Sequence, residues 1–294
     1  MIQFSKFPIY VVYSLHRQQA VKPLWNQYYN QREAAKVRSV EHLFKLDFKK
    51  LRRDLEVAGE KDGLIDAAMQ WQLMEDLDPK YRNEIREYDT AIARTLTTIS
   101  HTSIGKMLLD MINPAQKVWI IPADWDKTIA VTEPPKTEAQ GGGIGIFFNP
   151  KAFRKVTVSP HATADEVEDT LFHELVHAMR FSQNRFFRKS MTNRDFGNSE
   201  EFIATQFENV YHSSRRKSDL YGSYYGEYKR KKEMYQYLIE DAELVMALKF
   251  FLQTESLAKM VAHLQQPDYN PFRDFNEIEA RSLRHFGIDK FMDF

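Results

Sequence analysis

The segment from Thr163 to Gln183 reads TADEVEDTLFHELVHAMRFSQ. Its first four residues, Thr163 to Glu166, have the spacing of a capping box, in which each side chain binds the other residue's backbone amide, so a helix is expected to begin here. Apolar residues then recur every three or four positions and predict one buried helical face; they are Val167, Leu171, Leu175 and Ala178.

The same helix carries the pattern HExxH, formed by His173, Glu174 and His177. Two histidines four residues apart project from one helical face, so both imidazoles can bind one zinc ion. Glu174 lies beside them, where its carboxylate can hold and deprotonate a water molecule. The pattern therefore predicts a catalytic zinc site with Glu174 as the general base.

A catalytic zinc site needs a third protein ligand besides an open position for water. The chain has no cysteine and lacks the extension HExxHxxGxxH, so a downstream carboxylate is the expected source. Asn198 predicts the start of a second helix, which extends to residue 213 and contains three glutamates: Glu200, Glu201 and Glu208. Glu201 and Glu208 share one face, whereas Glu200 points elsewhere. In the alternative interpretation, Glu200 and Glu201 only complement the helix dipole, and Glu201 completes a capping box with Asn198.

The second helix also carries a resemblance to known zinc peptidases. HExxH followed by Glu-x-x-Ala on a second helix, here Glu201 to Ala204, resembles the gluzincin branch of the zinc metallopeptidases. The run Glu201-Phe-Ile-Ala-Thr-Gln-Phe is similar to the zinc-ligand helix of anthrax lethal factor-like proteases. In these families the first Glu of Glu-x-x-Ala is the ligand, which implies that Glu201 rather than Glu200 binds the metal. One departure is that the preceding stretch, Met191 to Gly197, contains no tyrosine.

A wider stretch, residues 100–212, resembles the bacterial effector metallopeptidases of the NleD type. The resembling parts are the run Thr102-Ser-Ile-Gly-Lys-Met-Leu-Leu-Asp, residues 118–121, the glycines before Ile144-Gly-Ile-Phe-Phe-Asn-Pro, and residues 173–180. The resemblance implies a zincin-like catalytic core, Zn²⁺ as cofactor, and endopeptidase activity on a protein or peptide substrate. It also implies delivery into another cell as a bacterial effector or toxin.

The remaining patterns place this core in an α+β fold with helical flanks. Apolar spacing predicts helices over residues 39–57 and 64–77, from Pro79 onward and over 103–112, and the texture beyond Ser218 is again helical. Short β-branched runs predict strands over residues 118–121, 144–148 and 155–158, with a loop containing Pro134 and Pro135 between the first two. We therefore expect a zincin-like core, a small mixed sheet plus active-site helices, at residues 113–213. It lies between a mainly helical region, 1–112, and a helical region, 214–294, that packs on the core.

Other side chains are candidates for supporting roles. Asp169 and Glu208 lie one and two helical turns from proposed ligands, where carboxylates commonly orient metal-bound histidines, although a solvated position is equally compatible with Asp169. Five side chains that end or follow the second helix are candidates for the oxyanion donor: Tyr211, His212, Tyr221, Tyr224 and Tyr225. Residues 144–148 are expected either as an edge strand to which an extended substrate adds, or as an ordinary core strand.

Composition excludes several other functions. Lys plus Arg and Asp plus Glu both number 41 in 294 residues, so no net field attracts nucleic acid. The absence of cysteine excludes disulfides, thiolate zinc sites, iron–sulfur clusters and a cysteine nucleophile. No apolar run is long enough to span a membrane, and the N-terminal stretch is a poor signal peptide. We expect a soluble protein that is cytoplasmic in the cell that makes it, with export by a specialised secretion system compatible with this; its oligomeric state is left open.

Two rival interpretations accompany the zinc metalloendopeptidase. The first is a catalytically silent zincin-fold interaction protein that acts through its helical flanks. The second is a helical adaptor in which HELVH is coincidental. The first differs from the peptidase in that its effect would survive the substitution Glu174→Gln, and the second in that it would bind no stoichiometric zinc.

Overall fold

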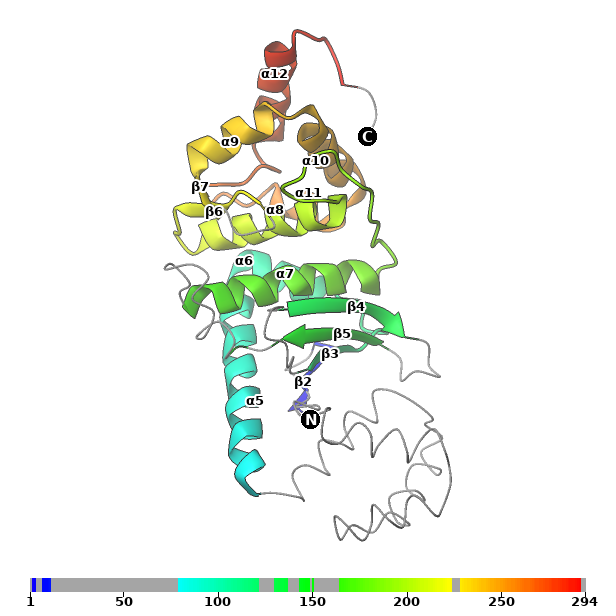
Figure 1. The fold of residues 1–294 in the computed structure, drawn as a ribbon, viewed down its shortest axis with the longest axis vertical. Coiled ribbons are helices and arrows are strands. Elements are labelled where there is room, and N and C mark those ends of the chain that lie inside the picture. Colours follow the sequence, from blue (N-terminus) through cyan, green and yellow to red (C-terminus); the bar gives the residue numbers. More distant parts are fainter. Residues whose placement is uncertain are drawn as a thin grey trace. The chain divides into compact units, whose positions relative to one another are not determined.

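The computed structural model describes residues 2–3, 7–11, 79–121, 130–136, 143–148, 150, 164–223 and 228–291. These residues form a mixed α+β protein, as the sequence predicts (Figure 1). The chain divides into two compact units: one contains residues 1–94 and 114–162, and the other contains residues 95–113 and 163–294. The units cut across the three regions suggested by the sequence, because residues 95–113 belong with the C-terminal half.

The first unit contains a sheet whose described strands follow the order β1-β2-β3-β5-β4, of which Figure 1 labels β2 to β5. The strands are β1 (Ile2–Gln3), β2 (Ile9–Val11), β3 (Val118–Ile121), β4 (Ala130–Lys136) and β5 (Gly143–Phe148). β2, β3 and β5 run parallel, whereas β1 and β4 are antiparallel to their neighbours, so the sheet is mixed. The predicted strands at 118–121 and 144–148 are confirmed, and every second residue of β5 is buried.

The structure decides between the two alternatives for β5 and corrects one further expectation about this sheet. β5 is an ordinary core strand rather than an edge strand, because it pairs with β3 on one side and with β4 on the other. The residues around Pro134 and Pro135 are not a loop but part of β4, which lies at one edge of the described strands. An edge strand tolerates proline because only one of its sides needs backbone donors, and the register with β5 shifts between Glu133 and Lys136, where the two prolines lie.

Two predicted helices, α5 (Pro79–Ser100) and α6 (Ser103–Met111), are confirmed. The buried stripe of α5 includes Tyr88, whose hydroxyl donates a hydrogen bond of 2.9 Å to the Phe148 carbonyl oxygen of β5. In α6 the glycine at position 105 is required, because a Cβ atom there would lie 2.0 Å from the Ile99 carbonyl oxygen. The helices expected at 39–57 and 64–77 and the strand expected at 155–158 lie outside the described residues.

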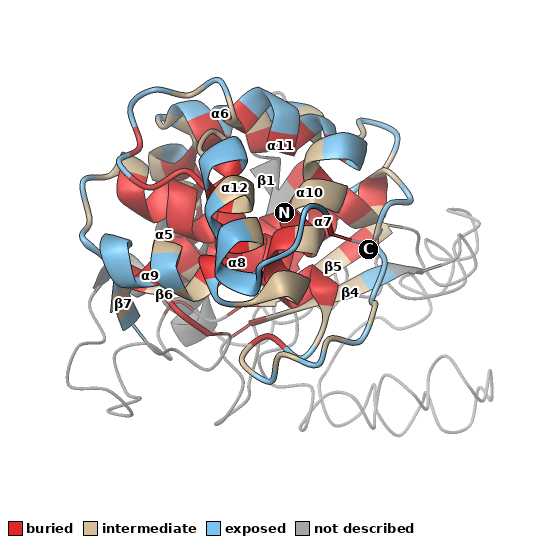
Figure 2. Cartoon of the chain, turned by 90° about the horizontal axis from the view of Figure 1, so that it is seen from above, coloured by how far each residue is buried: buried red, intermediate tan, exposed pale blue. Residues whose placement is uncertain are grey.

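The second unit is built around two long helices, α7 (Ala164–Ser182) and α8 (Ser199–Ser214), which pack side by side in both views (Figures 1 and 2). Both were predicted. Every residue from Ser199 to Ser213 is buried, so α8 is enclosed on all sides. A buried helix with this many polar residues must satisfy them internally, and these side chains build the site described below.

Further elements follow α8. They are the strands β6 (Asp219–Tyr221) and β7 (Tyr228–Arg230) and the helices α9 (Lys231–Ile239), α10 (Ala242–Thr254), α11 (Ser256–Val261) and α12 (Phe275–Phe286). The expectation of uniform helix beyond Ser218 is wrong for the antiparallel pair β6 and β7. A tertiary contact explains the difference: the Asn209 side chain accepts from the Tyr221 N–H at 2.7 Å and donates to the Tyr221 carbonyl oxygen at 2.9 Å, as a neighbouring strand would.

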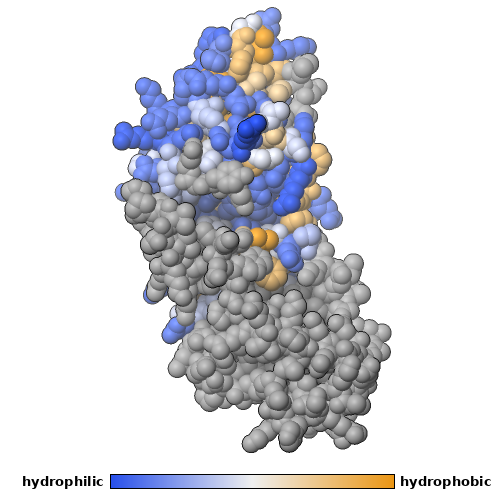
Figure 3. All heavy atoms as spheres, viewed as in Figure 1, coloured by the Kyte–Doolittle hydropathy of each residue, from blue (hydrophilic) through white to orange (hydrophobic). Residues whose placement is uncertain are grey.

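The surface of the described residues is largely hydrophilic in the view of Figure 3, with a hydrophobic group at the top, where α12 lies. Phe286 and Ile288, at the end of α12, are 40% and 42% exposed. None of the described helices combines the length and apolarity that a membrane crossing requires.

Candidate metal centre

The amino terminus of α8 is fixed by its capping residue. The side-chain oxygen of Asn198 accepts hydrogen bonds from the N–H groups of Glu200 at 3.0 Å and Glu201 at 3.1 Å. This is the expected N-cap, but the carboxylate of Glu201 extends toward α7 instead of completing a capping box. On α7, the expected cap Thr163 and the side chain of Glu166 lie outside the described residues.

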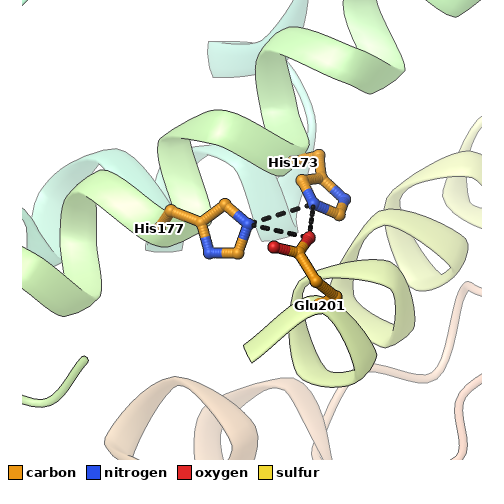
Figure 4. Close-up of side chains that lie close together, drawn as sticks. All are labelled: His173, His177 and Glu201. Carbon is orange, nitrogen blue, oxygen red and sulfur yellow. Dashed lines mark hydrogen bonds and ion pairs between the residues drawn. The ribbon is translucent and has the colours of Figure 1, made fainter. Parts of the chain in front are cut away.

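Three side chains from the two helices converge on one point (Figure 4). His173 Nε2 lies 3.1 Å from His177 Nε2 and 3.2 Å from Glu201 Oε2, and His177 Nε2 lies 3.4 Å from the same oxygen. All three residues are at most 9% exposed. Ligands that bind one zinc tetrahedrally at about 2.1 Å lie about 3.4 Å apart, so these separations fit a metal-ligand set.

The electrostatics of the cluster favour a positive charge at this point. Burial by itself would lower the pKa of His173, but hydrogen bonds to Glu201 and Glu208 outweigh it and raise that pKa well above its usual value. Burial would raise the pKa of Glu201, but hydrogen bonds to His173 and His177 hold it well below its usual range. The carboxylates around His173 thus favour a positive charge at this point, which a proton or a metal cation can supply.

Glu208 holds the other side of the His173 ring. Its Oε2 lies 2.9 Å from His173 Nδ1, and burial raises the pKa of this carboxyl group. A carboxylate on Nδ1 fixes the tautomer that presents Nε2 to a metal, which is the role expected of Glu208. His177 lacks a matching contact, because its buried Nδ1 has no hydrogen-bond partner in the part of the chain that the structure describes.

Glu174 is buried beside the two histidines, with 8% of its surface exposed. Its negative charge is close enough to His173 to contribute to the raised pKa of that histidine. A carboxylate in this position can exchange a proton with a water molecule at the cluster.

Asp169 has a different neighbourhood from the one expected. Its carboxylate lies 2.7 Å from His212 Nδ1 and accepts a longer hydrogen bond of 3.4 Å from the Tyr221 hydroxyl, and it bonds neither proposed histidine ligand. The reason is geometric: α7 and α8 pack so that Asp169 faces His212 one turn beyond the His173–Glu208 pair. Asp169 therefore orients His212, a candidate oxyanion donor, rather than a metal ligand.

The four tyrosines proposed as oxyanion donors differ in their surroundings. Burial raises the pKa of both Tyr211 and Tyr221, so both phenols stay protonated and can donate. Tyr211 stacks on Phe172 with ring centroids 4.3 Å apart, which indicates a packing role. Tyr224 and Tyr225 lie outside the described residues.

Glu200 points away from the cluster and forms a buried ion pair. Its carboxylate accepts two hydrogen bonds of 2.7 Å from Arg180, whose guanidinium also lies 2.7 Å from Glu255. Sequence reasoning did not single out Arg180. Its position seven residues after His173 puts Arg180 on the same face of α7 as that histidine, and this spacing could have indicated a buried cation that needs an acidic partner.

We compared the chain with protein-family models, with curated proteins and with solved structures. None of them matches it. A function can therefore be proposed only from the arrangement of these side chains and from the motif resemblance.

Proposed function

We propose that this protein is a zinc-dependent metalloendopeptidase with a zincin-like core. The observation that carries the proposal is the convergence of His173, His177 and Glu201 on one point at mutual distances of 3.1 to 3.4 Å. The mixed sheet and the two site helices, each within its own compact unit, are compatible with such a core. The motif resemblance supports the endopeptidase activity and a role as an exported bacterial effector or toxin.

The donor set suits zinc better than the hard cations. Two imidazoles and one carboxylate are ligands that zinc commonly takes in catalytic sites, whereas calcium and magnesium prefer oxygen alone. Zinc bound here would lower the pKa of a water molecule and polarise the carbonyl group of the scissile bond.

The chain's own residues would do the rest. Glu208 holds the His173 ring through Nδ1, so that Nε2 faces the point of convergence. Glu174 takes the proton of the attacking water and passes it to the amine that leaves. His212, held by Asp169, and Tyr221, whose hydroxyl would have to turn from Asp169, are candidates among the described residues for stabilising the oxyanion.

The test combines metal content with cleavage. Zinc per chain is measured by mass spectrometry on tag-free wild type, Glu201→Ala, Glu174→Gln and, as a control, Glu277→Ala at an exposed position of α12. We expect about one zinc per chain in all but Glu201→Ala. Cleavage of a synthetic peptide library should occur in wild type and fall at least about 100-fold in Glu174→Gln.

Other outcomes would reject the proposal. No zinc in wild type after reconstitution at neutral pH would exclude the catalytic metal site. Stoichiometric zinc with equal cleavage by wild type and Glu174→Gln would exclude the assigned base. A biological effect that survives Glu174→Gln with zinc bound would favour the silent interaction protein.

A further inference from the structure

The segment that follows α7, Arg185 to Lys189, runs alongside the metal centre. It reads Arg-Phe-Phe-Arg-Lys. The ring of Phe186 meets the ring of His177 edge-on, with centroids 5.7 Å apart. Phe186 also stacks on Phe181 at 3.7 Å, and both rings are only half-buried. An aromatic surface therefore borders one of the proposed metal ligands.

One edge of this segment is anchored to the protein. Every second residue makes the contacts: Arg185 N–H donates to the Arg180 carbonyl oxygen, and Phe187 N–H donates to the Glu200 carboxylate. The Phe187 carbonyl oxygen and the Lys189 N–H both bond the Ser199 hydroxyl, at 3.0 and 3.1 Å. These anchors come from the first turn of α8 and from α7, so the segment is fixed to both site helices.

The other edge is open. Within the described residues, the backbone N–H and C=O groups of Phe186 and Arg188 make no hydrogen bond. Alternation of bonded and open residues is the pattern of a strand at the edge of a sheet. The side chains agree, because the Arg188 guanidinium lies over the Phe186 ring at 5.3 Å, as residues two apart on one face of a strand do.

The exposed side chains of the segment define what would bind. Phe187 is 54% exposed, more than any other large hydrophobic residue that the structure describes. Arg188 is exposed, and no carboxylate pairs with it among the described residues, whereas Arg185 lies 3.7 Å from Glu255. The surface thus offers an apolar contact, a cation without an acidic partner and a set of open backbone groups.

We propose that Arg185–Lys189 is the docking strand for an extended substrate peptide, with an acidic side chain opposite Arg188 and a large apolar side chain against Phe187. The peptide adds to the open edge through the backbone groups of Phe186 and Arg188. Contact between Phe186 and His177 brings the paired peptide to the metal centre. The inference rests on the proposed function, since it names the substrate of that site.

Binding is tested on the zinc-loaded, full-length Glu174→Gln protein. The probe is a synthetic library of peptides of about ten residues in which acidic, basic and large apolar residues are equally frequent. We expect retained peptides to be enriched in an acidic and a large apolar residue. Arg188→Glu should lower the acidic enrichment about ten-fold and favour basic residues, and Phe187→Ala should lower the apolar enrichment about five-fold.

Matched controls lie elsewhere in the same unit. Phe286→Ala removes an aromatic side chain that is 40% exposed, and Lys259→Glu reverses an exposed charge on α11; neither should alter the enrichment. Zinc content should be the same in all variants. A second test uses retained peptides in two forms, N-methylated either at the odd-numbered or at the even-numbered residues. Only one set of backbone N–H groups faces the docking strand, so one form should lose binding and the other should keep it.

The outcomes separate the two proposals. Retained peptides that zinc-loaded wild type does not cleave would reject the peptidase and leave the docking strand intact. The docking strand would be overturned, and the peptidase would stand, if wild type cleaves the peptides but the Arg188 and Phe187 variants retain peptides with the same enrichment as the parent protein. Binding that N-methylation weakens equally in both registers would also overturn the docking strand. A library from which nothing is retained would also overturn the docking strand.

Discussion

Glu208 is a residue whose removal should weaken the proposed metal site without removing a ligand. Its carboxylate lies 2.9 Å from His173 Nδ1 and is buried with it. Glu208→Ala leaves that ring free to rotate and lowers its basicity, so we expect zinc affinity to fall about 10- to 100-fold. Competition with a chromogenic chelator measures the change. In Glu208→Gln, which keeps an acceptor oxygen, zinc affinity should fall less. Equal losses of affinity in the two variants would contradict an orienting role.

The pKa of His173 predicts how zinc binding depends on pH. Burial opposes the charged ring, but Glu201 and Glu208 raise its pKa well above the usual value of about 6.5. In the metal-free protein this proton stabilises the fold fully below pH of about 6.5, and that contribution is lost as pH rises through the raised pKa. Zinc must displace the proton, so its affinity should increase with pH, about ten-fold per unit, until His173 is deprotonated.

Calorimetric titration of zinc in buffers of different ionisation enthalpy measures this linkage. About one proton should be released per zinc at neutral pH, in proportion to the fraction of His173 that is protonated. An affinity that is independent of pH above neutrality would show that His173 is already deprotonated there.

At the scale of elements, one buried ion pair joins the two site helices. Arg180 on α7 is 1% exposed and Glu200 on α8 is fully buried, with two hydrogen bonds of 2.7 Å between them. Glu255, between α10 and α11, adds a third contact at 2.7 Å. Because Glu200 is adjacent to Glu201, this pair also sets the rotation of α8 that aims Glu201 at the histidines.

Removal of one partner should therefore cost much more than a surface change. Glu200→Gln leaves the Arg180 charge buried and incompletely paired, so we expect the free energy of unfolding to fall by about 3–5 kcal/mol. Urea denaturation checks this value. Glu243→Gln, on the more exposed first turn of α10, is the matched control and should change stability by less than about 1 kcal/mol. A similar loss of stability in both variants would show that the buried pair contributes no more than a surface contact.

At the scale of the whole molecule, the candidate metal site lies within one of the two compact units. All of its residues, from Asp169 to His212, belong to the unit of residues 95–113 and 163–294. A ligand that binds one folded unit stabilises that unit by mass action, by about 4.1 kcal/mol when free zinc is 1,000 times its dissociation constant.

Differential scanning calorimetry should therefore resolve a zinc-sensitive and a zinc-insensitive transition. Zinc should raise the temperature of the first in wild type and in Glu174→Gln, but not in Glu201→Ala. A single transition that zinc shifts as a whole would show that the units unfold together.

The amino-acid sequence alone determined the elements of this site and most of their bounds. HExxH, the Asn198 cap and the apolar spacing predicted α7 and α8, because helix caps and helical periodicity are local properties of the chain. The strands β3 and β5 followed from short β-branched runs for the same reason. The choice of Glu201 over Glu200 came from a resemblance, since both residues lie in one helical turn.

Tertiary structure decided the rest. Packing of α7 against α8 turns Glu201 toward the histidines and pairs Glu200 with Arg180. It also pairs Asp169 with His212 rather than with a proposed metal ligand. Pairing with β4 makes β5 an inner strand. Ser199 and Glu200 bond one edge of residues 185–189, which leaves the opposite edge for the proposed peptide. Periodicity tells which face of an element is buried, but the partner of each polar side chain depends on residues far away in the chain, which only the packed structure brings together.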